Sequence, residues 1–272
     1  MAMTPQPIAP PATTFRAPLP DAGTDVRLPS LSIVLPCFNE AENVKAAVAE
    51  AQRAAMLFAR RHEVIIVDDG STDATAVVAA SLAAADVRVR LVRHEHNRGY
   101  GAAVRTGIAA SRHDWVLLTD ADLQFDLSEL DRFVPLTGGH DLVIGFRIDR
   151  ADPAARRLAA HAWNRLMRRS FGVTATDIDC AFKLGRGTAL RALPLQSEGA
   201  MISTELLLLA AGSQLRIAEQ GVHHRPRLAG EPTGGDPRVV LRAFQERRRL
   251  LRRLRGRAGL GDLVAGVSPA RL

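Results

Sequence analysis

The architecture is clearest in Val64-Ile65-Ile66-Val67-Asp68-Asp69-Gly70-Ser71-Thr72-Asp73, where an apolar run passes directly into a cluster of carboxylates. Four consecutive β-branched residues favour a strand, and an apolar run without alternation is typical of a strand buried on both faces. Gly70 suits a tight turn, and Asp73 suits the start of the Ala-rich helix that follows. The stretch predicts a strand–turn–helix unit with acidic side chains at the carboxyl end of the strand.

The same pattern recurs on both sides of this stretch. Further strands are expected at 31–36, 87–92, 115–118 and 142–144, with helices at 41–60, 100–111 and 127–134 between them. Asn39 is expected to cap the first helix. Beyond these we expect a helix at 153–171, an extended piece at 177–184, a helix at 201–211 and a strand at 215–222. The alternation predicts an α/β fold with a mostly parallel central sheet flanked by helices, and ligands at the carboxyl ends of its strands.

Composition divides the 272 residues into four parts. Residues 1–29 are rich in Pro, Ala and Thr and are expected to be a disordered leader. Residues 30–236 form the main domain, residues 237–257 a basic amphipathic C-terminal helix, and residues 258–272 a flexible tail punctuated by glycine.

Charge, cysteine content and hydropathy limit where the chain works. The net charge of +7 is concentrated in residues 238–257, which hold nine arginines against one glutamate. The two cysteines are far apart and predict no disulfide framework, which favours a reducing compartment. No apolar run reaches the ~20 residues of a membrane span, and no signal peptide is expected. We expect a cytoplasmic protein, attached at most peripherally to the cytoplasmic face of the membrane.

Asp120-Ala121-Asp122 follows the apolar strand at 115–118. Two carboxylates separated by one small residue can share a divalent cation with a diphosphate, and such hard oxygen ligands suit Mg²⁺ or Mn²⁺. Gln124 adds a neutral oxygen ligand, so the predicted metal set is Asp120, Asp122 and Gln124. Histidines at 94, 96, 223 and 224 lack an evident third partner and are not expected to bind zinc.

Four motifs occur in this order along the chain: Pro36-Cys37-Phe38-Asn39-Glu40, Val67 to Asp73, Asn97-Arg98-Gly99-Tyr100-Gly101 and Asp120-Ala121-Asp122-Leu123-Gln124. Together they resemble family 2 glycosyltransferases of the GT-A fold, and especially the dolichol-phosphate mannosyltransferase-like branch. The resemblance covers roughly residues 31–244. It implies a metal-dependent hexosyltransferase that uses a nucleotide-diphosphate sugar.

The resemblance also implies roles for individual residues. The nucleotide sugar would be bound by Pro36, Phe38, Glu40, Asp69, Asp120, Ala121 and Asp122. Asp122, Arg147 and Arg227 would be the catalytic residues, with Arg227 in a loop that closes on the diphosphate. Asp179, Cys180 and Lys183 fall in the acceptor-side segment, where the family often has Ser-Gly-Phe-Arg, so Cys180 and Lys183 depart from the pattern.

The acceptor decides whether a general base is needed. A hydroxyl acceptor must lose a proton, whereas a lipid phosphate is already ionised. Candidate bases are Asp177, Asp179 and Glu205, but Glu205 lacks the Glu-Asp pair common in hydroxyl-accepting relatives. This favours a polyprenyl phosphate acceptor and a single displacement with inversion. The alternatives are transfer to a hydroxyl of a soluble or cell-envelope acceptor, and a catalytically silent binder of nucleotide sugar or nucleic acid.

The basic helix at 237–257 has apolar residues near one face and arginines on the other. Such a helix can lie on an anionic membrane surface, and it can equally pack on its own domain or form a homo-oligomer interface. Nucleic acid is the less favoured partner, because no aromatic residues alternate with the arginines to stack on bases.

Overall fold

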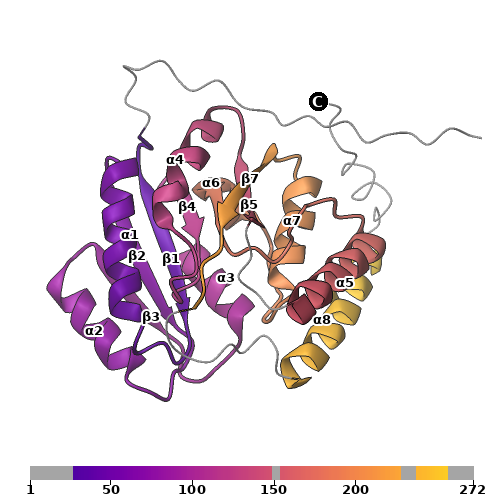
Figure 1. Ribbon diagram of the computed structural model, residues 1–272, viewed down its shortest axis with the longest axis horizontal. Coiled ribbons are helices and arrows are strands. Elements are labelled where there is room, and N and C mark those ends of the chain that lie inside the picture. The colour runs from indigo at the N-terminus through magenta and orange to yellow at the C-terminus, as the bar shows by residue number, and fades with distance from the viewer. Residues whose placement is uncertain (1–26, 149–153, 228–236, 257–272) are drawn as a thin grey trace, which may run out of the picture.

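The computed structural model describes residues 27–148, 154–227 and 237–256 (Figure 1). The strands are β1 (Leu31–Cys37), β2 (His62–Asp68), β3 (Val89–Arg93), β4 (Trp115–Leu118), β5 (Leu142–Ile148), β6 (Lys183–Arg186) and β7 (Ile217–His223). The α-helices are α1 (Val44–Phe58), α2 (Thr75–Ala85), α3 (Tyr100–Ala110), α4 (Leu130–Phe133), α5 (Ala154–Phe171), α6 (Gly187–Ala192), α7 (Ile202–Gly212) and α8 (Pro237–Gly256). Two 3₁₀ segments, η1 (Leu127–Glu129) and η2 (Val134–Gly138), flank α4. The predicted tail at 258–272, and the predicted leader up to residue 26, lie outside the described residues.

The strands form one seven-stranded sheet in the order β3-β2-β1-β4-β6-β5-β7. All neighbours pair in parallel except β6, which is antiparallel to both β4 and β5. The predicted α/β class with a mostly parallel sheet is therefore confirmed.

Helices cover both faces of the sheet because strand side chains alternate between two apolar layers. Ile33 and Leu35 of β1 pack in one cluster with α1 and α4. Val34 packs in the other cluster, which contains side chains of α3, α5, α7 and α8. This double burial explains why the strands read as continuous apolar runs.

The start of the first helix differs from the prediction. α1 begins at Val44, and Asn39 does not cap it. Asn39 instead adopts a positive φ of 55°, which asparagine tolerates better than most residues. From there its side-chain oxygen accepts the backbone N–H of Thr72 at 2.9 Å. Asn39 therefore joins the loops after β1 and β2.

The reversed strand β6 places an unexpected segment at the functional edge of the sheet. The carboxyl ends of β1, β2, β4 and β5 share one edge, and β6 enters the sheet at that edge because it runs the other way. Lys183 thus lies beside Leu118, directly before the Asp120 loop. The residues that precede β6 meet the loops that follow β4 and β5.

Helix α8 packs on the domain beside α5 (Figure 1). The rings of Phe244 and Trp163 meet edge to face at 5.6 Å between centroids. Leu250 and Leu254 are buried in the same apolar cluster as Met167 and Phe171 of α5. Within the described ranges, every helix is too short or too polar to cross a bilayer.

Candidate functional site

Asp120 and Asp122 lie in the loop after β4, on either side of the buried Ala121. Burial raises the pKa of Asp120, and the Tyr100 hydroxyl opposes that rise. Burial and the neighbouring charge of Asp120 raise the pKa of Asp122 to about 7. Two adjacent buried carboxylates thus disfavour each other's ionisation, and a cation between them would relieve the repulsion.

Arg227 provides one positive charge beside this pair. Its guanidinium forms an ion pair with Glu40 and lies 3.5 Å from Asp122. All three side chains are largely buried, with exposed fractions of 19% for Arg227, 12% for Glu40 and 11% for Asp122. Residues 187 positions apart in sequence are thereby joined across the edge of the sheet.

The chain around Arg227 is fastened to the loop that carries the carboxylates. The backbone N–H of Arg225 donates to the carbonyl of Gln124 at 2.8 Å, and the Gln124 side-chain amide donates to the carbonyl of Arg225 at 3.1 Å. An isolated antiparallel bridge joins Phe125 to His224. Gln124 therefore ties the two loops together, and its predicted role as a metal ligand stays a prediction.

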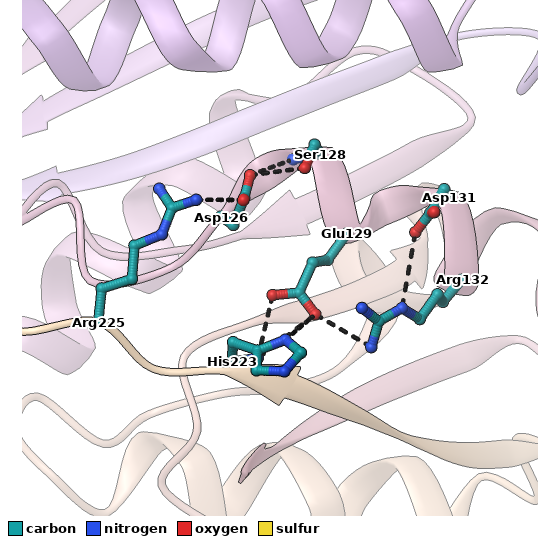
Figure 2. A pocket seen from close by; sticks show the side chains of 7 residues that line it. All are labelled: Asp126, Ser128, Glu129, Asp131, Arg132, His223 and Arg225. Atoms are coloured by element: carbon teal, nitrogen blue, oxygen red, sulfur yellow. Dashed lines mark hydrogen bonds and ion pairs between the residues drawn. The ribbon is translucent and has the colours of Figure 1, made fainter. Parts of the chain in front are cut away.

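A polar pocket of about 270 Å³ lies on the outer side of this junction, and Figure 2 shows its lining. Arg225 forms an ion pair with Asp126, whose carboxylate also accepts the backbone N–H of Ser128 at the start of η1. Glu129 accepts the backbone N–H of His223 at 3.0 Å and contacts its Nδ1 at 3.1 Å. These contacts hold the end of β7 against η1.

Asp120 and Asp122 fit a divalent cation that is also held by a ligand's phosphates. Among the residues that the structure describes, no three Asp, Glu, His or Cys side chains gather into a complete protein metal cage. Mg²⁺ is commonly held by one or two carboxylates with substrate phosphates completing its coordination. The mutual repulsion of Asp120 and Asp122 favours such an ion.

Asp69 lies at the carboxyl end of β2 and organises the turn before α3. It is buried and accepts the backbone N–H groups of Arg98 and Gly99 at 3.0 and 2.7 Å. Its Oδ1 also lies 2.6 Å from Nδ1 of the buried His94. Pro36 lies in β1 opposite Val67, and Phe38 directly follows that strand. Pro36, Phe38 and Asp69 therefore lie near the carboxyl ends of the neighbouring strands β1 and β2, and their contact with a nucleoside stays a prediction.

The predicted acceptor side lies next to Asp120. Arg147, at the end of β5, makes a two-pronged ion pair with Asp177, with distances of 2.6 and 2.9 Å. Burial opposes its charge, yet the Asp177 carboxylate holds the pKa of Arg147 above its ordinary value. Arg147 is thus engaged by the protein in this state.

Lys183 and Cys180 are buried, whereas Asp179 is exposed. The Lys183 ammonium donates to the backbone carbonyls of Ile178 and Cys180, and burial lowers its pKa. Burial raises the pKa of the Cys180 thiol to about 12. Lys183 and Arg147 both exert a positive field on Asp120. The binding of an acceptor by Asp179, Cys180 and Lys183 stays a prediction.

Sequence reasoning assigned no role to several residues that build this site. Tyr100 lies in the motif at 97–101, yet only the structure shows that its hydroxyl affects the pKa of Asp120. Asp126 and Glu129 read as ordinary helix-start acids, and their partners Arg225 and His223 lie about 100 positions away. A single sequence contains no signal for such long-range pairs.

The fold and the converging loops define a GT-A-like glycosyltransferase domain. Two structures of glucosyl-3-phosphoglycerate synthase from Mycobacterium tuberculosis are similar. The complex with phosphoglyceric acid has a TM-score of 0.59 at 24% identity and covers 80% of this chain and 79% of that one. The complex with Mn²⁺ and UDP-glucose has a TM-score of 0.58 at 23% identity and covers 80% and 78%. At this identity the likeness establishes the fold.

The chain belongs to glycosyl transferase family 2, whose model matches residues 32–194. Undecaprenyl-phosphate 4-deoxy-4-formamido-L-arabinose transferase from Pseudomonas fluorescens is 34% identical over 79% of this chain and 62% of that protein. Dodecaprenyl-phosphate galacturonate synthase from Rhizobium johnstonii is 31% identical over 78% of this chain and 64% of that protein. The chain thus spans less than two thirds of the length of these curated relatives. The family confirms the resemblance inferred from the four motifs.

Proposed function

We propose that this chain transfers a hexose from a nucleotide-diphosphate sugar to a polyprenyl phosphate at a membrane surface. Support for the acceptor comes from the names of the relatives, which are prenyl-phosphate sugar transferases and synthases. Support for the donor comes from Asp120, Asp122 and Arg227, which gather opposite charges where a metal-bound diphosphate would lie.

The observation that carries the choice of acceptor is that two of the three candidate general bases are already engaged. Asp177 is paired with Arg147. Glu205 is buried, accepts the backbone N–H groups of Gln196 and Ser197 at 2.9 and 2.6 Å, and pairs with Arg253 at 3.1 Å. A carboxylate held in this way is a poor proton acceptor, whereas a phosphate acceptor needs none.

The reaction is a single displacement. An oxygen of the acceptor phosphate attacks the anomeric carbon, its bond to the diphosphate oxygen breaks, and the nucleoside diphosphate leaves with the bonding electrons. Mg²⁺ or Mn²⁺ held by Asp120 and Asp122 would neutralise charge on that leaving group. Arg227 adds a positive charge on the same side, and the product has the inverted anomeric configuration.

The proposed membrane surface consists of the outer faces of α5 and α8. Arg165 and Arg169 of α5 are exposed, as are Arg248, Arg249 and Arg252 of α8. Among the residues that the structure describes, none of these arginines forms an ion pair with a carboxylate. A basic helical surface of this kind suits the phosphates of an anionic leaflet, and each arginine near that leaflet contributes ~1 kcal/mol.

The test is transfer with Mn²⁺ across a panel of GDP- and UDP-sugars, with and without polyprenyl phosphate in vesicles. We expect a lipid-linked sugar of inverted configuration, and its loss in Asp122→Ala. Donor hydrolysis without lipid product would instead assign a hydroxyl acceptor. No donor engagement under either metal would assign a silent binder, and a product with retained configuration would exclude the single displacement.

A further inference from the structure

The inner face of α8 contacts the segment at 196–201, which connects α6 to α7. Glu246 is buried and accepts the backbone N–H of Met201 at 3.4 Å. A Cβ atom on Gly199 would lie 2.6 Å from the Glu246 carboxylate, which would have to shift to make room for it. Arg253 pairs with Glu205 at 3.1 Å, and Glu205 accepts two backbone N–H groups of the same segment. Helix α8 therefore fixes this segment from behind.

The segment at 196–201 in turn supports the turn that precedes α3. The carbonyl of Glu198 accepts the backbone N–H of Ala102 at 3.0 Å. A Cβ atom on Gly99 would lie 2.5 Å from that same carbonyl, and one on Gly101 would lie 2.7 Å from the carbonyls of Ser197 and Gly199. Gly99 has a φ of 108°, which non-glycine residues rarely adopt. The turn thus rests directly on the segment, backbone against backbone.

Arg242 contacts all three parts: the turn at 98–100, the segment at 196–201 and α8 itself. Its Nη2 donates to the carbonyl of Arg98 at 3.0 Å. The same guanidinium lies 3.4 Å from Glu246 within α8 and 3.7 Å from Glu198 in the supporting segment. One side chain of α8 therefore contacts the turn itself and also Glu198 and Glu246, which lie behind it.

The other side of the turn belongs to the candidate site. Asp69 accepts the backbone N–H groups of Arg98 and Gly99. The adjacent Tyr100 opposes the rise in the pKa of Asp120. The turn at 98–100 is therefore held between Asp69 on one side and Arg242 on the other.

We propose that Arg242 and Glu246 are positioning residues for donor binding, which makes α8 a structural part of the donor site as well as a surface helix. They act through the turn at 98–100 and touch neither the sugar nor the diphosphate. The inference rests on the proposed function for its donor, while the geometry of the turn can be tested without one.

The experiment compares Arg242→Gln and Arg242→Lys with Arg53→Gln, which removes an exposed arginine of α1 on the opposite face of the sheet. We expect Arg242→Gln to raise the donor KM and Kd about tenfold, as for loss of a charge-assisted hydrogen bond, with the acceptor KM unchanged. Arg242→Lys should recover most of the affinity, because an ammonium still donates to the Arg98 carbonyl. Arg53→Gln should behave as the wild type.

A second readout separates this inference from the function on which it rests. Hydrogen exchange of the Arg98 and Gly99 amides should accelerate in Arg242→Gln and stay slow in Arg53→Gln. Wild-type donor affinity with unchanged exchange in Arg242→Gln would overturn the proposal, and so would equal losses in the glutamine and lysine variants. Should the wild-type protein bind no donor, the proposed function fails and the exchange measurement alone decides the role of Arg242.

Discussion

Asp120 and Asp122 place two carboxylates close together, and the neighbouring groups only partly offset the cost of ionising both. Burial and the charge of Glu40 raise both pKa values, and the charge of Asp120 raises that of Asp122 further. Tyr100, Arg147 and Lys183 oppose the rise at Asp120, and Arg227 opposes it at Asp122. The contact of Arg227 with Glu40 and Asp122 places a guanidinium where a metal-bound diphosphate would need to approach. We therefore predict that Arg227 exchanges these carboxylate partners for phosphate oxygens when a donor binds.

The raised pKa of Asp122 predicts a specific dependence of stability on pH. The folded state holds the proton of Asp122 up to about pH 7, whereas the unfolded state releases it near its ordinary value of 3.8. The folded state thus binds more protons between these values, so the free energy of unfolding of the metal-free protein falls as pH rises through this window. We expect a contribution of ~2–4 kcal/mol, since one pKa unit corresponds to ~1.4 kcal/mol.

Denaturant unfolding with a chelator present, from pH 4.5 to 8, measures this contribution. Asp122→Asn should show a flatter profile and should be more stable than the wild type at pH 8. Parallel profiles for the two proteins would show that Asp122 ionises normally.

Both cysteines should be unreactive in the native protein. Cys37 is 1% exposed and Cys180 is 0% exposed, and burial raises both thiol pKa values. Because the thiolate is the reactive form, a thiol reagent should modify neither cysteine natively and both after denaturation. Rapid native labelling of Cys180 would mean that the acceptor-side segment opens.

Much of the fold was predictable because its signals are local. The apolar runs ending in Asp68-Asp69 and before Asp120 marked strands, their carboxyl ends and their loops. The reversal of β6 was not predictable, since the direction of a four-residue strand depends on its neighbours. Arg147 was expected at phosphate, whereas the structure pairs it with Asp177, thirty positions away. Partner choice among many arginines depends on tertiary packing, which no local pattern encodes.

The junction of η1 with the end of β7 determines where Arg227 lies. Asp126 binds Arg225 and Glu129 binds His223 (Figure 2). The Gln124 amide donates to the carbonyl of Arg225, two residues before Arg227. The guanidinium that meets Asp122 is therefore placed by contacts that follow Asp122 in the same loop. The loop that contains Asp120 and Asp122 therefore also contains the residues that hold the segment leading to Arg227.

Glu129→Gln should loosen this junction selectively. Loss of the carboxylate charge weakens the bond from the His223 backbone N–H and removes the ion pair with Arg132 at 3.2 Å. We expect exchange of the His223 amide to accelerate about tenfold, as for loss of ~1.4 kcal/mol. Asp131→Asn is the matched control, because that carboxylate is 62% exposed and lies 3.9 Å from Arg132. Equal acceleration in both variants would attribute the effect to charge alone.

Basic side chains are distributed unevenly over the protein. Helices α5 and α8 lie side by side (Figure 1) and present Arg165, Arg169, Arg248 and Arg252 outward, while α1 and α2 cover the opposite part of the sheet. The helix expected to bind a membrane also packs on the domain through Leu250 and Leu254. Its two faces therefore have different roles, and removing the helix would disturb both the packing on the domain and the expected binding to a membrane.

Point substitutions separate these tasks. Arg248→Gln with Arg252→Gln should weaken binding to phosphatidylglycerol vesicles about thirtyfold at low salt, given ~1 kcal/mol for each arginine. Arg53→Gln with Arg61→Gln removes the same charge from the α1 side and should leave cosedimentation unchanged. Similar weakening by both pairs would indicate attraction by net charge, without a defined surface.

The contact of Arg242 with the turn at 98–100 has a consequence for how the protein is made. The sheet is complete once β7 has been synthesised, because its last strand ends at His223. Arg242 and Glu246 leave the ribosome later, so a nascent chain can finish its sheet while the turn still lacks its outer support. Competence to bind a donor would then be acquired only once α8 has been synthesised, after the sheet itself has formed.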